Sequence, residues 1–110
     1  MVRGYRIEKF EDISIFVDRI KNFNEKNIEC TDHTFFRLSE KQRKAFACDE
    51  LKRILINEIP LRVGIQYNGN YAAYYKYKEN RIIKIIINFK PTLIRIVTFM
   101  ILSQEQLPRG

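Results

Sequence analysis

At the start of the second half of the chain, apolar residues alternate with polar or small ones, in the period of two that a half-buried strand requires. The alternation is clearest from 61 to 67, and Asn68-Gly69-Asn70 follows it, a combination that tolerates the positive φ of a tight hairpin turn. Consecutive strands joined by such short turns predict a four-stranded antiparallel meander. Further turn signals at Glu79-Asn80 and Lys90-Pro91 set the expected strands at 61–67, 71–78, 81–89 and 92–102.

Helical spacing marks the first half of the chain. From 12 to 23 the apolar residues recur every three or four positions, and Asp12 is a suitable N-cap. A second helix is expected from about residue 32, and a further helical stretch begins at Asp49 and ends before Pro60. Together with the meander, these segments predict an α+β fold in which N-terminal helices pack on a four-stranded antiparallel sheet.

A chain of 110 residues with 45% hydrophobic content has the size of one domain with a modest core. We therefore expect a single domain over 1–110, with 1–27 as an added N-terminal helical segment and 103–110 as a flexible tail without periodicity. No signal peptide is indicated, and no apolar run approaches the roughly 20 residues of a membrane-spanning helix. These features predict a soluble protein that does not bind membranes.

The two cysteines, Cys30 and Cys48, lack the spacing of a disulfide framework. A reducing, cytoplasmic setting is the simpler interpretation, and a single disulfide between them is the alternative. Cys30 also forms a C-x-x-H fragment with His33, but a zinc site needs more ligands than this pair and no second pair exists. We expect no metal site.

The charge of the chain is unevenly distributed. Its net charge is +7, yet residues 1–30 hold six basic and six acidic side chains, so the whole excess lies in the remaining part. A field of this sign attracts polyanions such as RNA and raises the rate of encounter with them. The alternative is a lysine-rich surface that serves solubility alone.

The only histidine, His33, stands four residues ahead of Arg37. If this segment is helical, the two side chains share a face. Imidazole exchanges protons near neutral pH, and a guanidinium can hold two phosphate oxygens at once, so the pair is suited to chemistry on a phosphodiester. The alternative is a histidine at a helix start that is satisfied by its neighbours.

Further candidates lie on the expected strands. Arg95 interrupts an apolar strand, where a charge needs a partner or an open cleft. Tyr67, Tyr71 and Tyr75 cluster near the first hairpin with Arg62, and rings interleaved with cations can stack unpaired bases and neutralise phosphates. Tyrosine is also common in strands on propensity alone, so a structural role remains open.

This order of elements, with a histidine at the head of a helix, resembles the RelE-like ribonuclease toxin superfamily, and in particular its small domains with an H-x-x-x-R helix. The resemblance covers about 28–102, which would form the RelE-like core. The matching segments are His33–Arg37, Asp49–Leu55, the hairpin at Asn68–Asn70, and the closing strand Ile94–Phe99.

The resemblance implies metal-independent RNA cleavage, in which His33 carries a proton, Arg37 contacts the phosphate and Thr98 places a hydroxyl near the helix start. It also implies RNA, free or on the ribosome, as substrate and a cognate antitoxin as partner, and a homodimer is possible. The residues expected to bind RNA are Arg43, Lys44, Arg62, Tyr67, Tyr71, Tyr75 and Arg95.

Several other activities are excluded by missing motifs. The sequence has no phosphate-binding glycine loop, dinucleotide fingerprint, zinc-protease helix or esterase elbow, so little enzymology besides nuclease chemistry remains and no cofactor is expected. The alternative function is a non-catalytic nucleic-acid-binding or protein-interaction module on the same fold.

Overall fold

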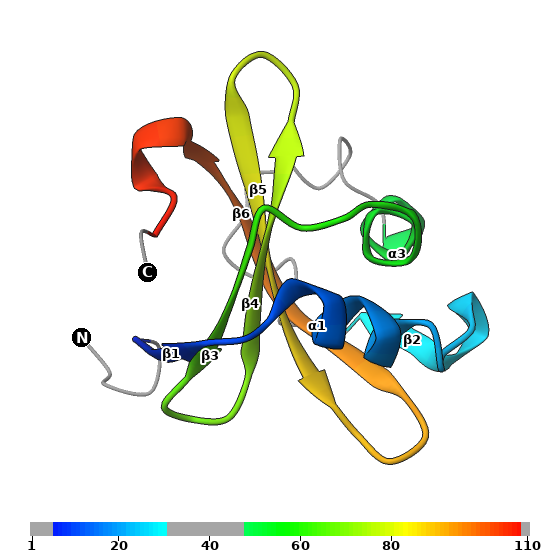
Figure 1. Cartoon of the computed structure of the whole chain (residues 1–110). Helices are drawn as coiled ribbons and strands as arrows, with labels where there is room; N and C mark the ends of the chain where they lie inside the picture. Colours follow the sequence, from blue (N-terminus) through cyan, green and yellow to red (C-terminus); the bar gives the residue numbers. More distant parts are fainter. Residues whose placement is uncertain (1–5, 31–47, 109–110) are drawn as a thin grey trace.

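The computed structural model describes residues 6–30 and 48–108, and its central element is a six-stranded sheet (Figure 1). The strand order is β1-β3-β4-β5-β6-β2. The strands are β1 (Ile7–Phe10), β2 (Ile28–Cys30), β3 (Arg62–Gln66), β4 (Tyr71–Tyr77), β5 (Arg81–Phe89) and β6 (Ile94–Ser103). The helices are α1 (Ile13–Ile20), α3 (Cys48–Asn57) and the short 3₁₀ turns η2 (Glu25–Asn27) and η4 (Gln104–Gln106).

The predicted four-stranded antiparallel sheet is wrong, because two strands from the first half of the chain extend it at both edges. β1 pairs with β3 in antiparallel fashion, and β2 pairs with β6 in parallel, so the sheet is mixed. The strands β3 to β6 do pair consecutively and antiparallel, within two residues of their expected bounds. The edge strands have four and three residues, too few to display a period of two in the sequence.

The helices α1 and α3 lie on one face of the sheet (Figure 1). Because neighbouring side chains of a strand point to opposite faces, each strand gives every second residue to this helix-covered face. The main core forms there, where the helices contribute Phe16, Ile20, Leu51 and Leu55, and the strands contribute Ile28, Val63, Ala73, Tyr75, Ile83, Ile85, Ile87, Ile94, Ile96 and Phe99.

The opposite side of the sheet, called the far face below, has a smaller apolar cluster built on Ala72, Tyr74, Ile82 and Ile86. Leu107, just after η4, packs against it, and Arg62 donates a hydrogen bond from Nε to the Pro108 carbonyl at 3.2 Å. Ser103, Leu107 and Pro108, within the segment expected to be a tail, thus contact the sheet.

The N-cap predicted for α1 is confirmed. The Asp12 carboxylate accepts hydrogen bonds from the backbone N–H groups of Ser14, at 2.9 Å, and Ile15, at 3.2 Å. The Ser14 hydroxyl also donates to it, and this bond is the main reason why the pKa of Asp12 is lowered, with the two backbone bonds adding to the effect. Asp12 therefore fixes the start of the helix whose Phe16 and Ile20 enter the core.

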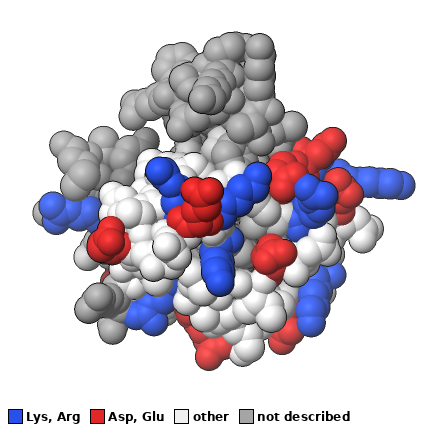
Figure 2. Space-filling view, turned by 90° about the horizontal axis from the view of Figure 1, so that it is seen from above, with Lys and Arg blue, Asp and Glu red and all other residues white. Residues whose placement is uncertain are grey.

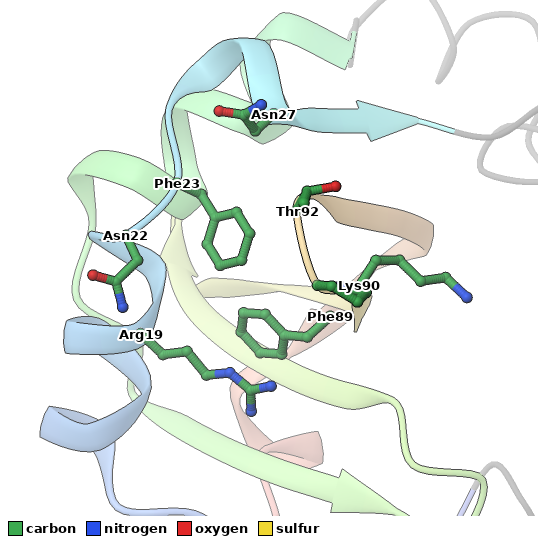
Figure 3. Close-up of a pocket in the computed structure, with 8 residues that line it drawn as sticks. Arg19, Asn22, Phe23, Asn27, Phe89, Lys90 and Thr92 are labelled. Atoms are coloured by element: carbon green, nitrogen blue, oxygen red, sulfur yellow. The ribbon is translucent and has the colours of Figure 1, made fainter.

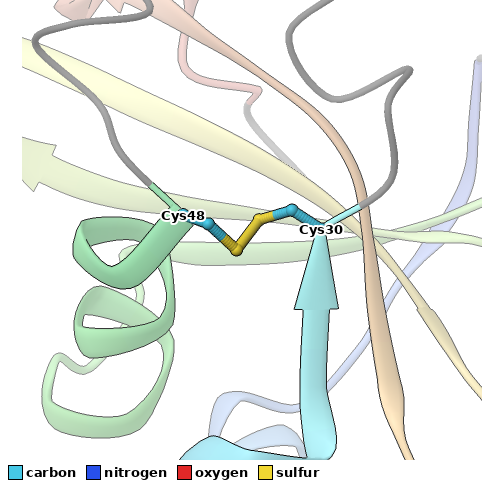
Figure 4. The surroundings of a disulfide bond; sticks show 2 residues. All are labelled: Cys30 and Cys48. Carbon is cyan, nitrogen blue, oxygen red and sulfur yellow. A yellow bond between two sulfur atoms is a disulfide. The ribbon is translucent and has the colours of Figure 1, made fainter.

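A disulfide joins Cys30, the last residue of β2, to Cys48, the first residue of α3 (Figure 4). The two Cα atoms are 6.0 Å apart and the residues are 18 apart in sequence. This is the alternative that the sequence left open. The bond ties the start of α3 to the edge of the sheet and closes the segment 31–47 into a covalent loop.

Among the described residues, 6–30 and 48–108, no helix is long and apolar enough to cross a membrane.

Gly64 of β3 lies against the Ile7 side chain of the neighbouring strand β1. A Cβ atom placed on Gly64 would meet Ile7 Cδ1 at 2.7 Å and Ile7 Cγ2 at 2.9 Å. Gly64→Ala should therefore lower the free energy of unfolding, measured in urea, by about 1–3 kcal/mol, the usual cost of overpacking. Adding Ile7→Ala removes the clash, so the double variant should lose less than the sum of the two single losses. Full additivity would contradict this contact.

Candidate nucleic-acid interface

The predicted site residues fall into separate groups. His33, Arg37, Arg43 and Lys44 lie outside the described residues. The side chains of three others, Arg62, Thr98 and Arg95, point to the far face of the sheet. Their cross-strand partners are Tyr74, Ile86 and Asn88, which belong to that face because side chains alternate along a strand.

Side chains of the far face form rows across the strands. Arg62, Tyr74, Lys84 and Met100 are consecutive partners from β3 to β6. Thr98 belongs to the next row and is a diagonal neighbour of Lys84, and such neighbours lie about 7–8 Å apart. Strands are spaced by about 4.8 Å, so Arg62 and Lys84 start about 10 Å apart. Two long cationic side chains and a hydroxyl are therefore close enough to contact the same phosphate, or two consecutive phosphates of one strand.

Lys84 is a candidate site residue that the sequence reasoning did not select. It is half-buried on the central strand β5, and this burial lowers the pKa of its ammonium group below the ordinary value of 10.5. Its Nζ lies 5.6 Å from the centroid of the Tyr74 ring. Among the described residues no carboxylate lies within ion-pair distance of it. The available signal was a lysine inside the otherwise apolar run from Ile82 to Ile87.

Such a lysine is chemically suited to an anion. A half-buried ammonium group has lost part of its hydration, and here no described carboxylate compensates for that loss. A phosphate bound to the ammonium group would offset this loss of hydration energy, because opposite charges attract more strongly in a medium less polar than water. The Tyr74 ring beside it is itself buried, and this burial raises the pKa of the Tyr74 hydroxyl to about 12, so that the hydroxyl stays protonated at neutral pH.

Two of the predicted RNA-binding arginines already have partners within the protein. Arg95 donates from Nε to the Glu29 carboxylate at 3.0 Å, and the parallel register of β2 and β6 places the two residues opposite each other. Arg62 donates to a backbone carbonyl, and its guanidinium carbon lies 4.5 Å from the centroid of the Phe10 ring. Neither of these two partners of Arg62 is an anion, whereas Glu29 forms an ion pair with Arg95.

The three predicted base-stacking tyrosines differ in exposure. Tyr75 is 1% exposed in the main core, so a base could reach its ring only if the core opened. Burial, and to a smaller extent Glu58, raises the pKa of Tyr75, and its hydroxyl has no hydrogen-bond partner among the described residues. Tyr71 packs on the helix-covered side, edge-on to Phe89. Tyr67, which is 54% exposed beside the β3–β4 turn, is the tyrosine of these three with a ring open to a base.

The described surface is electrostatically mixed. Figure 2 shows basic and acidic side chains interspersed on the face of the molecule seen there. Within 6–30 and 48–108, no group of three histidine, cysteine or acidic side chains is placed to hold a metal ion. The described side chains on that face thus form no continuous basic patch.

Comparisons with protein-family models, curated proteins and solved structures found no match to this chain. The likeness to RelE-like toxins stays a prediction that the quoted residues alone carry.

Proposed function

We propose that the protein is a RelE-like, toxin-type ribonuclease that acts in the cytoplasm, binds RNA across the far face of the sheet and is held in check by an antitoxin. The observation that carries the proposal is Lys84, a half-buried cation at the centre of that face with no described carboxylate to pair with it. Arg62 lies on one side of it, two strands away on β3, and the Thr98 hydroxyl lies on the other side, on the adjacent strand β6. A phosphodiester is the common ligand that satisfies all three groups.

In the proposed mechanism, His33 transfers the proton and Arg37 binds the scissile phosphate. Lys84 stabilises the additional negative charge of the transition state, and Thr98 donates a hydrogen bond to a phosphate oxygen. The register of β2 supports this assignment, because Cys30 pairs with Ile96, two residues before Thr98. The chain therefore enters the segment that contains His33 beside the strand that carries Thr98.

Expression of the protein should arrest growth, and the double variant His33→Ala, Arg37→Ala should relieve the arrest, because removing a proton carrier typically slows such chemistry by about 10²–10⁴-fold. The purified double variant should lose RNA cleavage by a similar factor. Lys9→Ala, which removes an exposed lysine of β1 that lies 24 residues before His33, is the control and should remain toxic. A double variant that is as toxic as the parent would overturn the proposed site.

A second candidate function is a module that binds nucleic acid without cleaving it. The observation that favours it is that two of the residues expected to bind RNA already have partners within the protein. Arg95 forms an ion pair with Glu29, and Tyr75 is buried in the main core. Filter binding at increasing salt, run beside a cleavage assay on free and ribosome-bound RNA, separates the two functions. Salt-sensitive binding with no cleavage would favour the module.

A further inference from the structure

A pocket of about 530 Å³ opens between the end of α1 and the β5–β6 hairpin (Figure 3). Arg19, Asn22 and Phe23 line one side of it and Phe89 and Lys90 line the other, with Asn27 of η2 at the rim. Phe89 packs against the main core, so the pocket lies on the helix-covered side of the sheet, away from Lys84. Its volume falls within the range of about 300–1,000 Å³ that is usual for small-molecule sites.

The pocket has an aromatic wall. The ring centroids of Phe23 and Phe89 are 6.0 Å apart, and the rings are tilted by 40° (Figure 3). The Phe89 ring is also held by edge contacts, with Tyr71 at 5.0 Å and 87° and with Phe16 at 6.0 Å and 72°. Four packed rings make this wall rigid, so a planar ligand that stacked there would order few side chains on binding.

A cation lies over the face of one ring of the aromatic wall. The guanidinium carbon of Arg19 lies 3.9 Å from the Phe89 ring centroid and 5.5 Å from that of Tyr71. Arg19 donates one hydrogen bond from Nη1 to the Tyr71 hydroxyl at 3.0 Å, which leaves further N–H groups for a ligand. Lys90 adds a second, exposed cation, and none of the described residues that line the pocket is acidic.

We propose that this pocket binds a single nucleotide, with its base against the rings of Phe23 and Phe89 and its phosphate on Arg19 and Lys90. The amides of Asn22 and Asn27 can both donate to and accept from a base edge. A purely apolar ligand would leave the two cations unused, and an inorganic anion would leave the rings unused. The nucleotide is either free or an unpaired unit of an RNA strand, and the site does not depend on the cleavage proposed for the other side of the sheet.

Isothermal titration of the full chain with AMP, adenosine, inorganic phosphate and a single-stranded RNA tetranucleotide tests the proposal. AMP should bind more tightly than adenosine or phosphate, and Phe23→Leu should weaken it about tenfold, since one stacked ring typically contributes that much. Arg19→Gln should weaken binding of AMP but not of adenosine. Lys90→Ala, at an exposed position, removes a pocket cation without touching the core, and Arg81→Gln is the control for an exposed arginine outside the pocket.

The tetranucleotide distinguishes the two sources of the nucleotide. Binding of the tetranucleotide alone, weakened by Arg19→Gln and Phe23→Leu but not by Lys84→Met, would assign the pocket to an RNA strand. Binding of AMP with the same dependence would assign it to a free nucleotide. Two results would overturn the proposal. In the first, AMP binds no better than adenosine and phosphate, and the tetranucleotide binds the Arg19→Gln and Lys90→Ala variants as tightly as the parent. In the second, neither AMP nor the tetranucleotide binds.

Discussion

Replacing Lys84 with methionine should reduce the rate of RNA cleavage by about a hundredfold, the usual effect of removing one preorganised charge-stabilising group from a transition state. Methionine keeps the apolar stem of the side chain and removes only the charge. Because the parent protein half-buries this charge with no described carboxylate beside it, Lys84→Met should fold at least as stably as the parent. Single-turnover cleavage of a labelled RNA measures the rate, and urea denaturation measures the stability.

The matched control is Lys76→Met, which removes an exposed lysine of β4 from the same face. Its loss should be small, because a charge in water contributes little to binding. If both variants cleave RNA as fast as the parent, Lys84 has no part in the reaction. If Lys84→Met cleaves RNA slowly but also unfolds at a lower urea concentration than the parent, the lower rate is caused by the weakened fold and not by a missing site residue.

The pH dependence of the Lys84 contribution has a definite sign. Because burial lowers its pKa, Lys84 should lose its proton at a lower pH than the 10.5 of an ordinary lysine. RNA affinity that depends on this charge should therefore begin to fall at a lower pH than the 10.5 at which an ordinary lysine titrates, whereas Lys84→Arg should keep its affinity. The penalty of burying the charge is fully present below the lowered pKa and disappears as pH rises towards 10.5, so the stability gained by Lys84→Met should shrink over the same interval.

Removing the disulfide should lower the free energy of unfolding by about 3 kcal/mol, the chain-entropy value for a loop of this length. In the double variant Cys30→Ala, Cys48→Ala, no bond closes the unfolded chain into a loop between these two positions, which are 18 residues apart. The loss is a large fraction of the roughly 5–15 kcal/mol that stabilises a small domain. Urea denaturation at equilibrium is the measurement.

A reductant provides the control for the disulfide. Treating the parent with a phosphine should produce the same loss as the double variant, and the double variant should not respond to it. Equal stabilities of parent and double variant would contradict a bond that constrains the unfolded chain. Because reducing compartments keep thiols reduced, mass spectrometry of alkylated protein taken directly from cells also tests the proposed cytoplasmic location.

The sequence alone determined those parts of the fold whose signals are local. The strand β3 alternates apolar with polar or small residues, and turn residues separate the strands β3 to β6. Asp12 caps α1 through hydrogen bonds to residues two and three positions away. Glycine and asparagine at the first hairpin act in the same way, since Gly69 has a φ of +89°. Such features depend on near neighbours, so the sequence predicts them without a three-dimensional structure.

Only the tertiary structure decided how distant segments meet. Ile28–Cys30 has an extended sequence in either case, but its parallel pairing with β6 depends on a partner 66 residues away. The pairing of Cys30 with Cys48, the burial of Tyr75 and the convergence of Phe23 and Phe89 on Arg19 are of the same kind. Lys84 was visible in the sequence as an interruption of an apolar strand. Its role as a candidate phosphate ligand became visible only when the register placed it between Tyr74 and Met100, because burial and missing counter-charges are properties of packing and not of sequence order.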